Sequence, residues 1–168
     1  MLTQARLKEV LHYDPETGVF KWVVLISNVK AGAVAGSKHN KGYLMISIDS
    51  KRYLSHRLAW FYIHGWWPTD QIDHINGVKD DNRLCNLREA TPAENARNTG
   101  IRATNTSGYK GVSLRKEIKK YAARVRHNGR CFFLGYFDCP KEAHAAYCAA
   151  AEKLNGEFMN DGTGDDNE

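Results

Sequence analysis

A carboxylate, an imidazole and two amides stand near one another in this sequence, as Asp73-His74, Asn86 and Asn95. Asp73 and the side-chain oxygen of Asn95 suit Mg²⁺, which prefers a few oxygen ligands and keeps several waters. Mn²⁺ accepts the same oxygen ligands and can substitute for Mg²⁺. His74 is able to take a proton from an attacking water near neutral pH. Together these groups could hydrolyse a phosphodiester bond with one hard metal ion.

The strand that carries Asp73 and His74 must end or bend at His74 if both side chains are to serve one site. Neighbouring residues on a regular strand point to opposite faces, so Asp73 and His74 can otherwise not serve one site. Gly77, shortly afterwards, permits such a departure. The alternative is that Asp and Asn near loops only form turns and caps. For Asn86 the two interpretations almost coincide, because bracing a loop is itself a structural role.

A helix must carry Asn95. Thr91 is a good N-cap, Pro92 suits the first helical position, and Glu94 completes a capping box with Thr91. This pattern places Asn95 in the first helical turn, on a rigid element that follows the preceding strand.

The chain resembles the HNH nuclease family at these residues, in particular the phage homing-endonuclease branch with Asn in the last position. The resemblance covers roughly residues 53–98 and includes SHRLAWFYIHGWWP, DHINGVKDDNRLCNLR and the triplet AEN. It implies a ββα-metal nuclease module with His74 as general base and with Asp73 and Asn95 as metal ligands. Asn86 would be the middle Asn, which braces the loop and orients the segment that bears the histidine.

A further helix precedes this segment. Ser55 can cap a helix from His56 to about His64, ended by Gly65. His56 and Arg57 open that helix and are further candidates for facing DNA or the scissile phosphate. The alternative for a histidine at a helix start is a surface or capping role.

Length and composition agree with a soluble nuclease. A chain of 168 residues is enough for one ordinary domain or two small ones. No apolar run approaches the ~20 residues of a membrane span, and MLTQARLKEV lacks the apolar core of a signal peptide. The four cysteines include no C-x-x-C pair, so no structural zinc site is expected. We therefore expect a cytoplasmic protein, in the host cytoplasm if the chain is phage-encoded.

A basic segment follows. Residues 97–130 contain ten Lys or Arg against the single Glu117, whereas the last residues, NDGTGDDNE, are acidic. Such a segment favours a polyanionic partner. The alternative is a solvated basic surface without a partner.

The same segment has the periodicity of three short strands, GYKGVSLRKE, KKYAARVRHNGR and CFFLGYFDCP. Asn128-Gly129 is a strong hairpin signal between the second and third. In the middle strand, apolar residues alternate with Arg124 and Arg126, so that one face would carry the arginines. A helix follows, with Pro140 in its first turn and Gly156 as its stop. Its apolar residues recur at helical spacing: Ala143, Ala146, Tyr147, Ala150 and Leu154.

Residues 107–160 resemble the plant ethylene-response-factor (APETALA-type) DNA-binding domain. The matching motifs are YKGV, YAA, LGYFD and the alanine-rich helix with a final Asn160. The resemblance implies a sheet that lies in the major groove of duplex DNA. Ser113 stands where the plant domains carry Arg, and the usual Trp nearby is missing, so the base-reading code cannot be transferred. By position the DNA contacts would be Lys110, Arg115, Arg124, Arg126 and Arg130.

The predicted fold class is α+β, a ββα-metal (HNH) module followed by a small three-stranded antiparallel sheet packed on one helix. We expect a nuclease domain at 1–98 (core 53–98), a linker at 99–106, a DNA-binding domain at 107–160 and a disordered acidic tail at 161–168. The predicted function is a metal-dependent endonuclease, of the phage homing type, that nicks or cuts duplex DNA. A single site in a monomer favours nicking. A catalytically inactive DNA-binding regulator and an RNA-binding protein remain as alternatives.

Overall fold

A computed structural model describes residues 1–25 and 29–162. The chain divides into two compact units, Met1–Thr91 and Pro92–Glu168. Of the predicted tail at 161–168, only Asp161 and Gly162 belong to the described residues, and 163–168 lie outside them. The division after Thr91 precedes the helix that carries Asn95. The domain and linker boundaries of the sequence analysis stay predictions.

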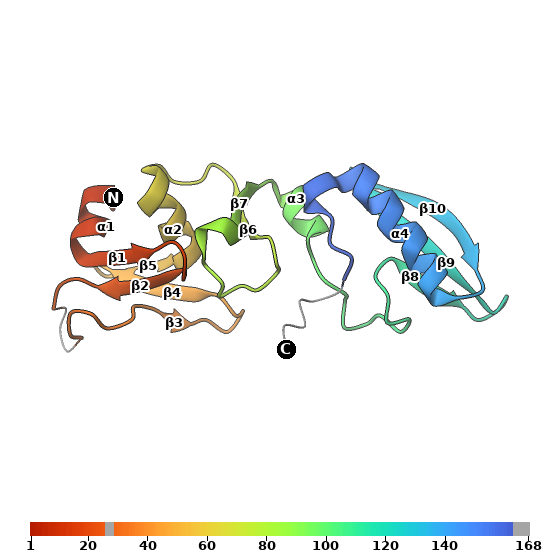
Figure 1. The fold of residues 1–168 in the computed structure, drawn as a ribbon, viewed down its shortest axis with the longest axis horizontal. Helices are drawn as coiled ribbons and strands as arrows, with labels where there is room; N and C mark the ends of the chain where they lie inside the picture. Colours follow the sequence, from red (N-terminus) through yellow and green to blue (C-terminus); the bar gives the residue numbers. More distant parts are fainter. Residues whose placement is uncertain (26–28, 163–168) are drawn as a thin grey trace. The chain divides into compact units, whose positions relative to one another are not determined.

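Small antiparallel sheets and the helices α1 and α2 build the described part of the first unit (Figure 1). Its sheets are β1–β2, β3–β4–β5 and β6–β7. None of the helices in the described part of the chain has the length and apolar character to cross a membrane. The elements are α1 (Gln4–Val10), β1 (Leu11–Asp14), β2 (Val19–Trp22), β3 (Ser37–Lys38), β4 (Leu44–Ile48), β5 (Lys51–Leu54), α2 (Ser55–His64), β6 (Gln71–His74), the 3-10 turn η1 (Leu84–Asn86) and β7 (Leu87–Ala90).

One hydrophobic core joins these elements. Leu7 of α1, Leu11 and Tyr13 of β1, Ile46 of β4 and Leu58 of α2 are almost completely buried in it. The β1–β2 hairpin and the helix α2 therefore share their packing with the strand that bears the candidate site, because Ile72 of β6 and Leu87 of β7 belong to the same cluster.

The start of α2 differs from the sequence expectation. Leu54, with an extended backbone, is the N-cap, and Ser55 is the first helical residue. The Ser55 hydroxyl is buried and has no hydrogen-bond partner among residues of the described ranges. Ser55 therefore does not cap the helix. The predicted end is confirmed, because Gly65 adopts a left-handed conformation and its N–H bonds to Phe61 O at 3.0 Å.

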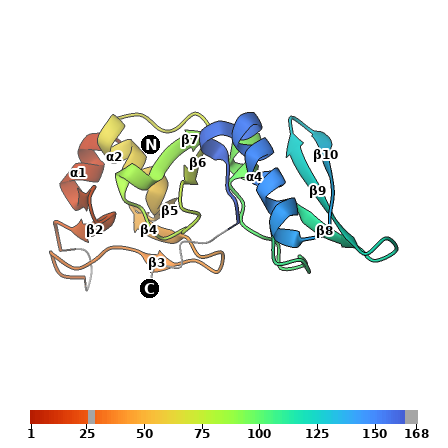
Figure 2. The ribbon, with the colours of Figure 1, turned by 45° about the vertical axis from the view of Figure 1, so that its right-hand side comes forward.

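The second unit is the predicted three-stranded sheet packed on one helix, which confirms the α+β fold class. The strand order is β10–β9–β8, and α4 lies along one face of this sheet (Figures 1 and 2). Asn128 and Gly129 have φ angles of 48° and 76°, the values required by the tight turn that the sequence predicts. The elements are α3 (Pro92–Arg97), β8 (Val112–Arg115), β9 (Lys120–His127), β10 (Arg130–Phe137), α4 (Pro140–Asn155) and the 3-10 turn η2 (Gly156–Phe158).

Small residues let α4 approach the sheet closely. Ala143, Tyr147 and Ala151 are its buried residues, one helical turn apart. Ala143 and Tyr147 confirm the predicted apolar face, and the half-buried Ala150 and Leu154 pack against the same core, while Ala151 is a buried residue that the prediction did not include. Gly111 has a φ of +75°, and a Cβ at this position would lie 2.1 Å from Tyr147 Cδ2. Glycine is therefore required there both by the backbone conformation and by the aromatic ring.

Candidate active site and nucleic-acid interface

His74 is the last residue of β6 and is only 5% exposed. The strand ends there because the chain turns back, with Gly77 N–H bonded to His74 O at 2.8 Å and Gly77 at φ +75°. His74 Nε2 lies 3.3 Å from the side-chain oxygen of Asn82. The ring of His56 meets that of His74 edge to face, with centroids 5.0 Å apart. Tyr43 lies near the same imidazole, at 6.0 Å between centroids.

Burial keeps both imidazoles neutral near physiological pH. It lowers the pKa of His74, an effect that the hydrogen bond to Asn82 and the charge of Asp73 oppose. Burial also lowers the pKa of His56 to about 3, helped by the positive charges that His74 and Arg57 can carry. A neutral His74 has a nitrogen lone pair with which it can accept a proton.

Asp73 is held by an arginine on the neighbouring strand. Its cross-strand partner in the β6–β7 hairpin is Arg88. Arg88 donates to Asp73 Oδ2 from Nε at 2.9 Å and from Nη2 at 2.8 Å. The Asp73 side chain is 4% exposed and the Arg88 side chain is 13% exposed. A carboxylate buried to this degree needs such a partner, because an unpaired buried charge is strongly destabilising.

Asn86 spans the loop that follows His74. Its side-chain oxygen accepts the backbone N–H of Asn76 at 3.0 Å, and its amide nitrogen donates to Asp81 O at 2.8 Å. These two bonds connect the beginning and the end of the loop. The residue is 6% exposed. Its amide therefore fixes the loop that carries His74 at its base, while a role in catalysis stays a prediction.

Charged side chains add to the order of this loop. Arg83 and Asn76 both donate to the carboxylate of Asp81, whose pKa is lowered to about 2, chiefly by the bond from Arg83. Lys38 reaches the loop from β3 and contacts Asp80 at 2.8 Å. The loop is thus held by ion pairs as well as by Asn86.

Arg57, the other residue predicted at the start of α2, has a different surrounding from His56. Its guanidinium donates to Asp70 O at 3.0 Å and to Pro68 O at 3.2 Å. Arg57 therefore ties α2 to the segment that enters β6. His56, in contrast, lies against His74 and is buried rather than at the surface.

Asp73 is the one predicted metal ligand that lies in the first unit. Among the described residues, no three His, Cys, Asp or Glu side chains cluster in a way that could hold an ion. Mg²⁺ does not require such a cage, since it is usually held by one or two carboxylates together with waters and substrate phosphates. Asp73 supplies one buried carboxylate in the first unit. Asn95 lies on α3 in the second unit, and its assignment as a ligand rests on the sequence pattern.

The β8–β10 sheet carries the predicted arginines. Ala123 and Val125 of β9 are buried, whereas Arg126 is exposed and Arg124 half-buried. This alternation confirms that one face of the strand is apolar and the other basic. Arg130 begins β10 in an exposed position, and Arg115 ends β8 half-buried.

Lys110 departs from this group. Its amine donates to Arg97 O at 3.0 Å and to Asn160 Oδ1 at 3.5 Å. Burial lowers its pKa to about 8. The Lys110 amine therefore makes its hydrogen bonds within its own unit.

The basic surface extends beyond the predicted DNA contacts. A groove within the second unit is lined by Arg97, Arg102, Arg124 and Arg126 among others. Arg97 Nη2 also donates to Asn128 Oδ1 at 2.7 Å. Aromatic rings lie beside the arginines, with the Arg124 guanidinium 5.7 Å from the ring of Phe133. Phe133 and Tyr136 are 51% and 50% exposed, a high value for such large rings.

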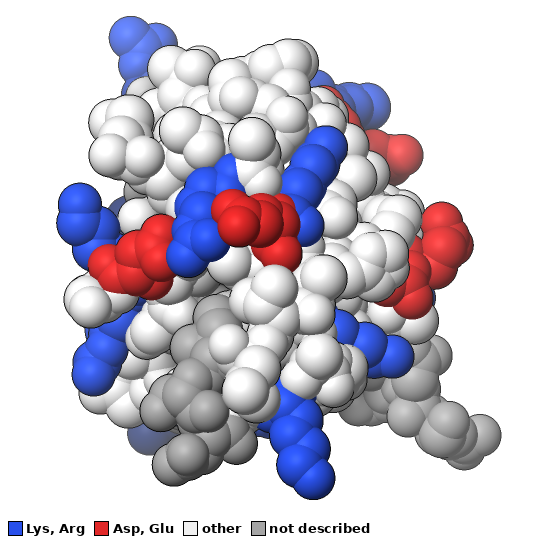
Figure 3. Space-filling view, turned by 90° about the vertical axis from the view of Figure 1, so that its left-hand side faces the viewer, with Lys and Arg blue, Asp and Glu red and all other residues white. Residues whose placement is uncertain are grey.

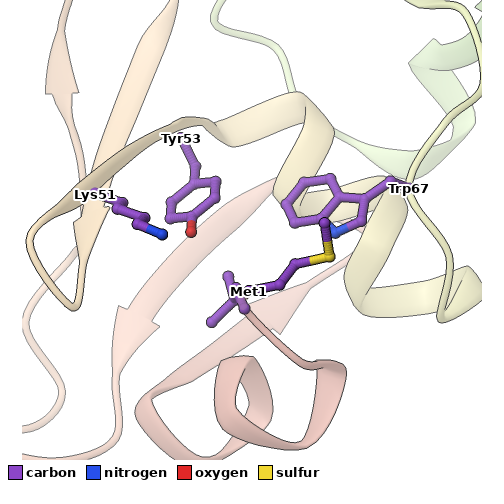
Figure 4. A pocket seen from close by; sticks show the side chains of 5 residues that line it. Met1, Lys51, Tyr53 and Trp67 are labelled. Atoms are coloured by element: carbon purple, nitrogen blue, oxygen red, sulfur yellow. The ribbon is translucent and has the colours of Figure 1, made fainter.

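Two surfaces of the first unit differ from this basic groove of the second unit. On the face drawn in Figure 3, basic and acidic side chains lie next to one another without forming one continuous patch. A hollow lined by Met1, Leu2, Lys51, Tyr53 and Trp67 is largely apolar and aromatic (Figure 4). It contains none of the candidate catalytic residues.

Comparisons with known proteins give the same two-part organisation. Residues 53–97 match the HNH endonuclease family, and residues 107–157 match the AP2 domain family. An uncharacterized HNH endonuclease of Acanthamoeba polyphaga mimivirus is 34% identical over 115 residues, 67% of this chain and 59% of the viral protein. Protein 3.8 of Escherichia phage T7 is 42% identical over 59 residues, 35% of this chain and 49% of that protein.

The chain contains an HNH domain followed by a C-terminal AP2-type domain, as the sequence resemblances indicated. It spans about half to three fifths of the length of the two viral relatives.

Two residues of the candidate site had no individual signal in the sequence. Arg88 could have been found only by pairing β6 with β7 in the correct register, which places it opposite Asp73. Asn82 belongs to a loop rich in Asp and Asn, where such residues are expected anyway.

Burial of His56 predicts an acid-sensitive first unit. Its pKa is about 3 in the folded chain and 6.5 ordinarily, so between these pH values only the unfolded chain binds the proton. Stability should therefore fall as pH falls from 6.5, by up to about 1.4 kcal/mol per pH unit from this group. His56→Gln should reduce this slope in urea unfolding measured at several pH values, and His12→Gln, at an exposed position, should leave it unchanged. Equal slopes in wild type and His56→Gln would contradict the assignment.

Proposed function

We propose that the chain is a metal-dependent endonuclease that hydrolyses phosphodiester bonds in duplex DNA. The observation that carries this proposal is the buried, neutral His74 at the end of β6, preceded by the ion-paired Asp73 and followed by a loop that Asn86 braces. The match to the HNH endonuclease family and the viral relative named as an HNH endonuclease support the same activity.

In this proposal His74 acts as general base. It removes a proton from a water molecule, whose oxygen then attacks the phosphorus atom in line with the leaving 3′-oxygen. Asn86 contributes by holding the loop after His74 in place. Burial around His74 keeps its imidazole neutral and ready to accept the proton.

Asp73 and, from the sequence pattern, Asn95 would hold Mg²⁺, with Mn²⁺ as a substitute. When bound, such an ion stabilises negative charge on the phosphate and on the leaving oxygen. Arg88 orients the Asp73 carboxylate through Oδ2. The products would carry a 5′-phosphate and a 3′-hydroxyl, as the family resemblance implies.

The second unit would supply DNA binding. Arg115, Arg124, Arg126 and Arg130 can attract phosphates or read base edges from the sheet, and Arg97 and Arg102 extend this basic surface. Lys110 stays a predicted DNA contact, with its amine bonded to Arg97 O within the same unit. The match to the AP2 domain family supports duplex DNA as the partner.

We also propose a biological setting for this activity. A phage or viral origin agrees with the viral relatives, whereas the role as a homing endonuclease rests on the sequence resemblance alone. One active site in a monomer would nick one strand.

A second candidate is a DNA-binding regulator without catalysis. The Asp73–Arg88 ion pair favours it, because Arg88 occupies part of the carboxylate that a metal would need. Cleavage assays separate the two candidates, since a regulator would bind DNA and leave it intact.

Removal of the general base should abolish catalysis without affecting binding. In His74→Ala, single-turnover cleavage of a labelled duplex with Mg²⁺ should slow by about 10²–10⁴-fold, the usual contribution of a general base. Affinity measured by fluorescence anisotropy should remain nearly unchanged. His12→Ala, at an exposed position on β1, serves as control. Full activity in His74→Ala would rule out this mechanism.

Loss of the sheet arginines should weaken DNA binding. An Arg that contacts a base should cost about 1–3 kcal/mol at one sequence position, whereas one that contacts a phosphate should weaken all sequences and lower the salt slope by about one. The double variant Arg124→Ala/Arg126→Ala should show one or both effects in binding titrations over a range of salt. Lys153→Ala, at an exposed position on α4, is the matched control. Unchanged affinity, site preference and salt slope in the double variant would contradict DNA binding through this face.

A further inference from the structure

Asn82 is the hydrogen-bond partner of the candidate general base. It lies in the loop between β6 and η1 and is only 1% exposed. Its side-chain oxygen lies 3.3 Å from His74 Nε2. Both side chains are buried. The direction of this hydrogen bond therefore decides whether Nε2 of the imidazole carries a hydrogen.

The orientation of the Asn82 amide follows from its second contact. The amide nitrogen donates to Asp80 O at 3.3 Å. If the amide were rotated by 180°, the side-chain oxygen of Asn82 would face Asp80 O, and neither oxygen has a hydrogen to donate. The carbonyl oxygen of Asn82 must therefore face His74. An amide oxygen has no hydrogen to donate, so His74 Nε2 must carry the hydrogen of this bond.

The backbone around Asn82 is anchored against the β1–β2 hairpin. The backbone oxygen of Asn82 accepts the hydroxyl of Tyr13 at 2.7 Å. Leu84 N–H bonds to Pro15 O at 3.0 Å. At Gly18, a Cβ would lie 2.4 Å from Arg83 N and 2.5 Å from the Asn82 carbonyl carbon. Asn82 is therefore held by an element far from it in sequence and has little freedom to leave His74.

We propose that Asn82 is a positioning residue that fixes His74 in the Nε2–H tautomer and leaves Nδ1 as the nitrogen that accepts the proton. In a neutral imidazole, the hydrogen bond made by one nitrogen decides the state of the other. The catalytic part of this inference rests on the proposed function. A water O–H bond breaks, its proton goes to Nδ1, and the resulting imidazolium still donates Nε2–H to Asn82.

The tautomer can be measured directly by NMR on the full-length chain. Two-dimensional ¹H–¹⁵N spectra of the imidazole side chains, recorded where His74 is neutral and assigned with His74→Gln, distinguish protonated from unprotonated ring nitrogens. We expect hydrogen on Nε2 and an unprotonated Nδ1. Hydrogen on Nδ1 in the wild-type protein would overturn the proposal without any need for a variant.

Variants at Asn82 test the cause of this state. Asn82→Leu removes the acceptor at similar volume, so His74 should become a mixture of tautomers. Cleavage should fall by about 10–100-fold in kcat, as expected for lost outer partners of a functional histidine, with DNA affinity unchanged. Asn82→Asp keeps an acceptor and should retain the Nε2–H state.

Asn76→Leu is the matched control. Asn76 braces the same loop through Asp81 and Val78, and a loss of loop order alone should leave the tautomer of His74 unchanged. Equal populations of Nε2–H in Asn82→Leu and wild type would contradict the proposal. Full cleavage in His74→Ala would instead disprove the proposed function, while the tautomer assignment would stand.

Discussion

Burial of an imidazole at the last residue of a strand is the constraint on which the active-site region depends. A buried histidine must stay neutral or be paired, and its polar nitrogens need partners. For His74 Nε2 this partner is Asn82, which belongs to the loop between β6 and β7. Gly77 turns the chain after His74, and the Asn86 side chain bonds to Asn76 and Asp81 within the loop.

Asp73 shows the same principle for a negative charge. The carboxylate is buried in a pairing that the hairpin register imposes, because Asp73 and Arg88 are directly opposite each other. Breaking such a pair by removing one partner would leave an uncompensated charge, which costs about 3–5 kcal/mol. Arg88 thus both stabilises the hairpin and orients the group proposed to hold the metal. A bound cation would share this carboxylate with the guanidinium, and their mutual repulsion would limit metal affinity.

Local signals in the sequence predicted much of the fold, and non-local contacts explain the failures. Gly65 and Asn128-Gly129 were predicted correctly because the backbone conformation of a few neighbouring residues decides a helix end or a hairpin turn. Ser55 was wrongly expected to be a cap, because tertiary packing buries it as the first helical residue. Lys110 was grouped with the arginines by position; its amine reaches groups distant in sequence, which local patterns do not specify, and its contact with DNA stays a prediction.

The residues of the candidate site also fall into those that the local sequence indicates and those that only tertiary contacts place. Its residue types and spacing indicated the chemistry, and the family matches agree with it. The positions of Asn82 and of Arg88 depend on loop closure and on strand register, which composition and periodicity do not specify. His56 illustrates a mixed case: the sequence placed it at the start of α2, but only the packing of α2 against β6 brings its ring to His74.

The most direct test of the central claim is cleavage of a supercoiled plasmid by the wild-type chain with Mg²⁺, with and without EDTA. The account predicts conversion to relaxed circles that DNA ligase can reseal, because the ends would be a 5′-phosphate and a 3′-hydroxyl, and no conversion with EDTA. Plasmid that is bound but remains supercoiled with Mg²⁺ and with Mn²⁺ would contradict the account and favour the catalytically inactive regulator.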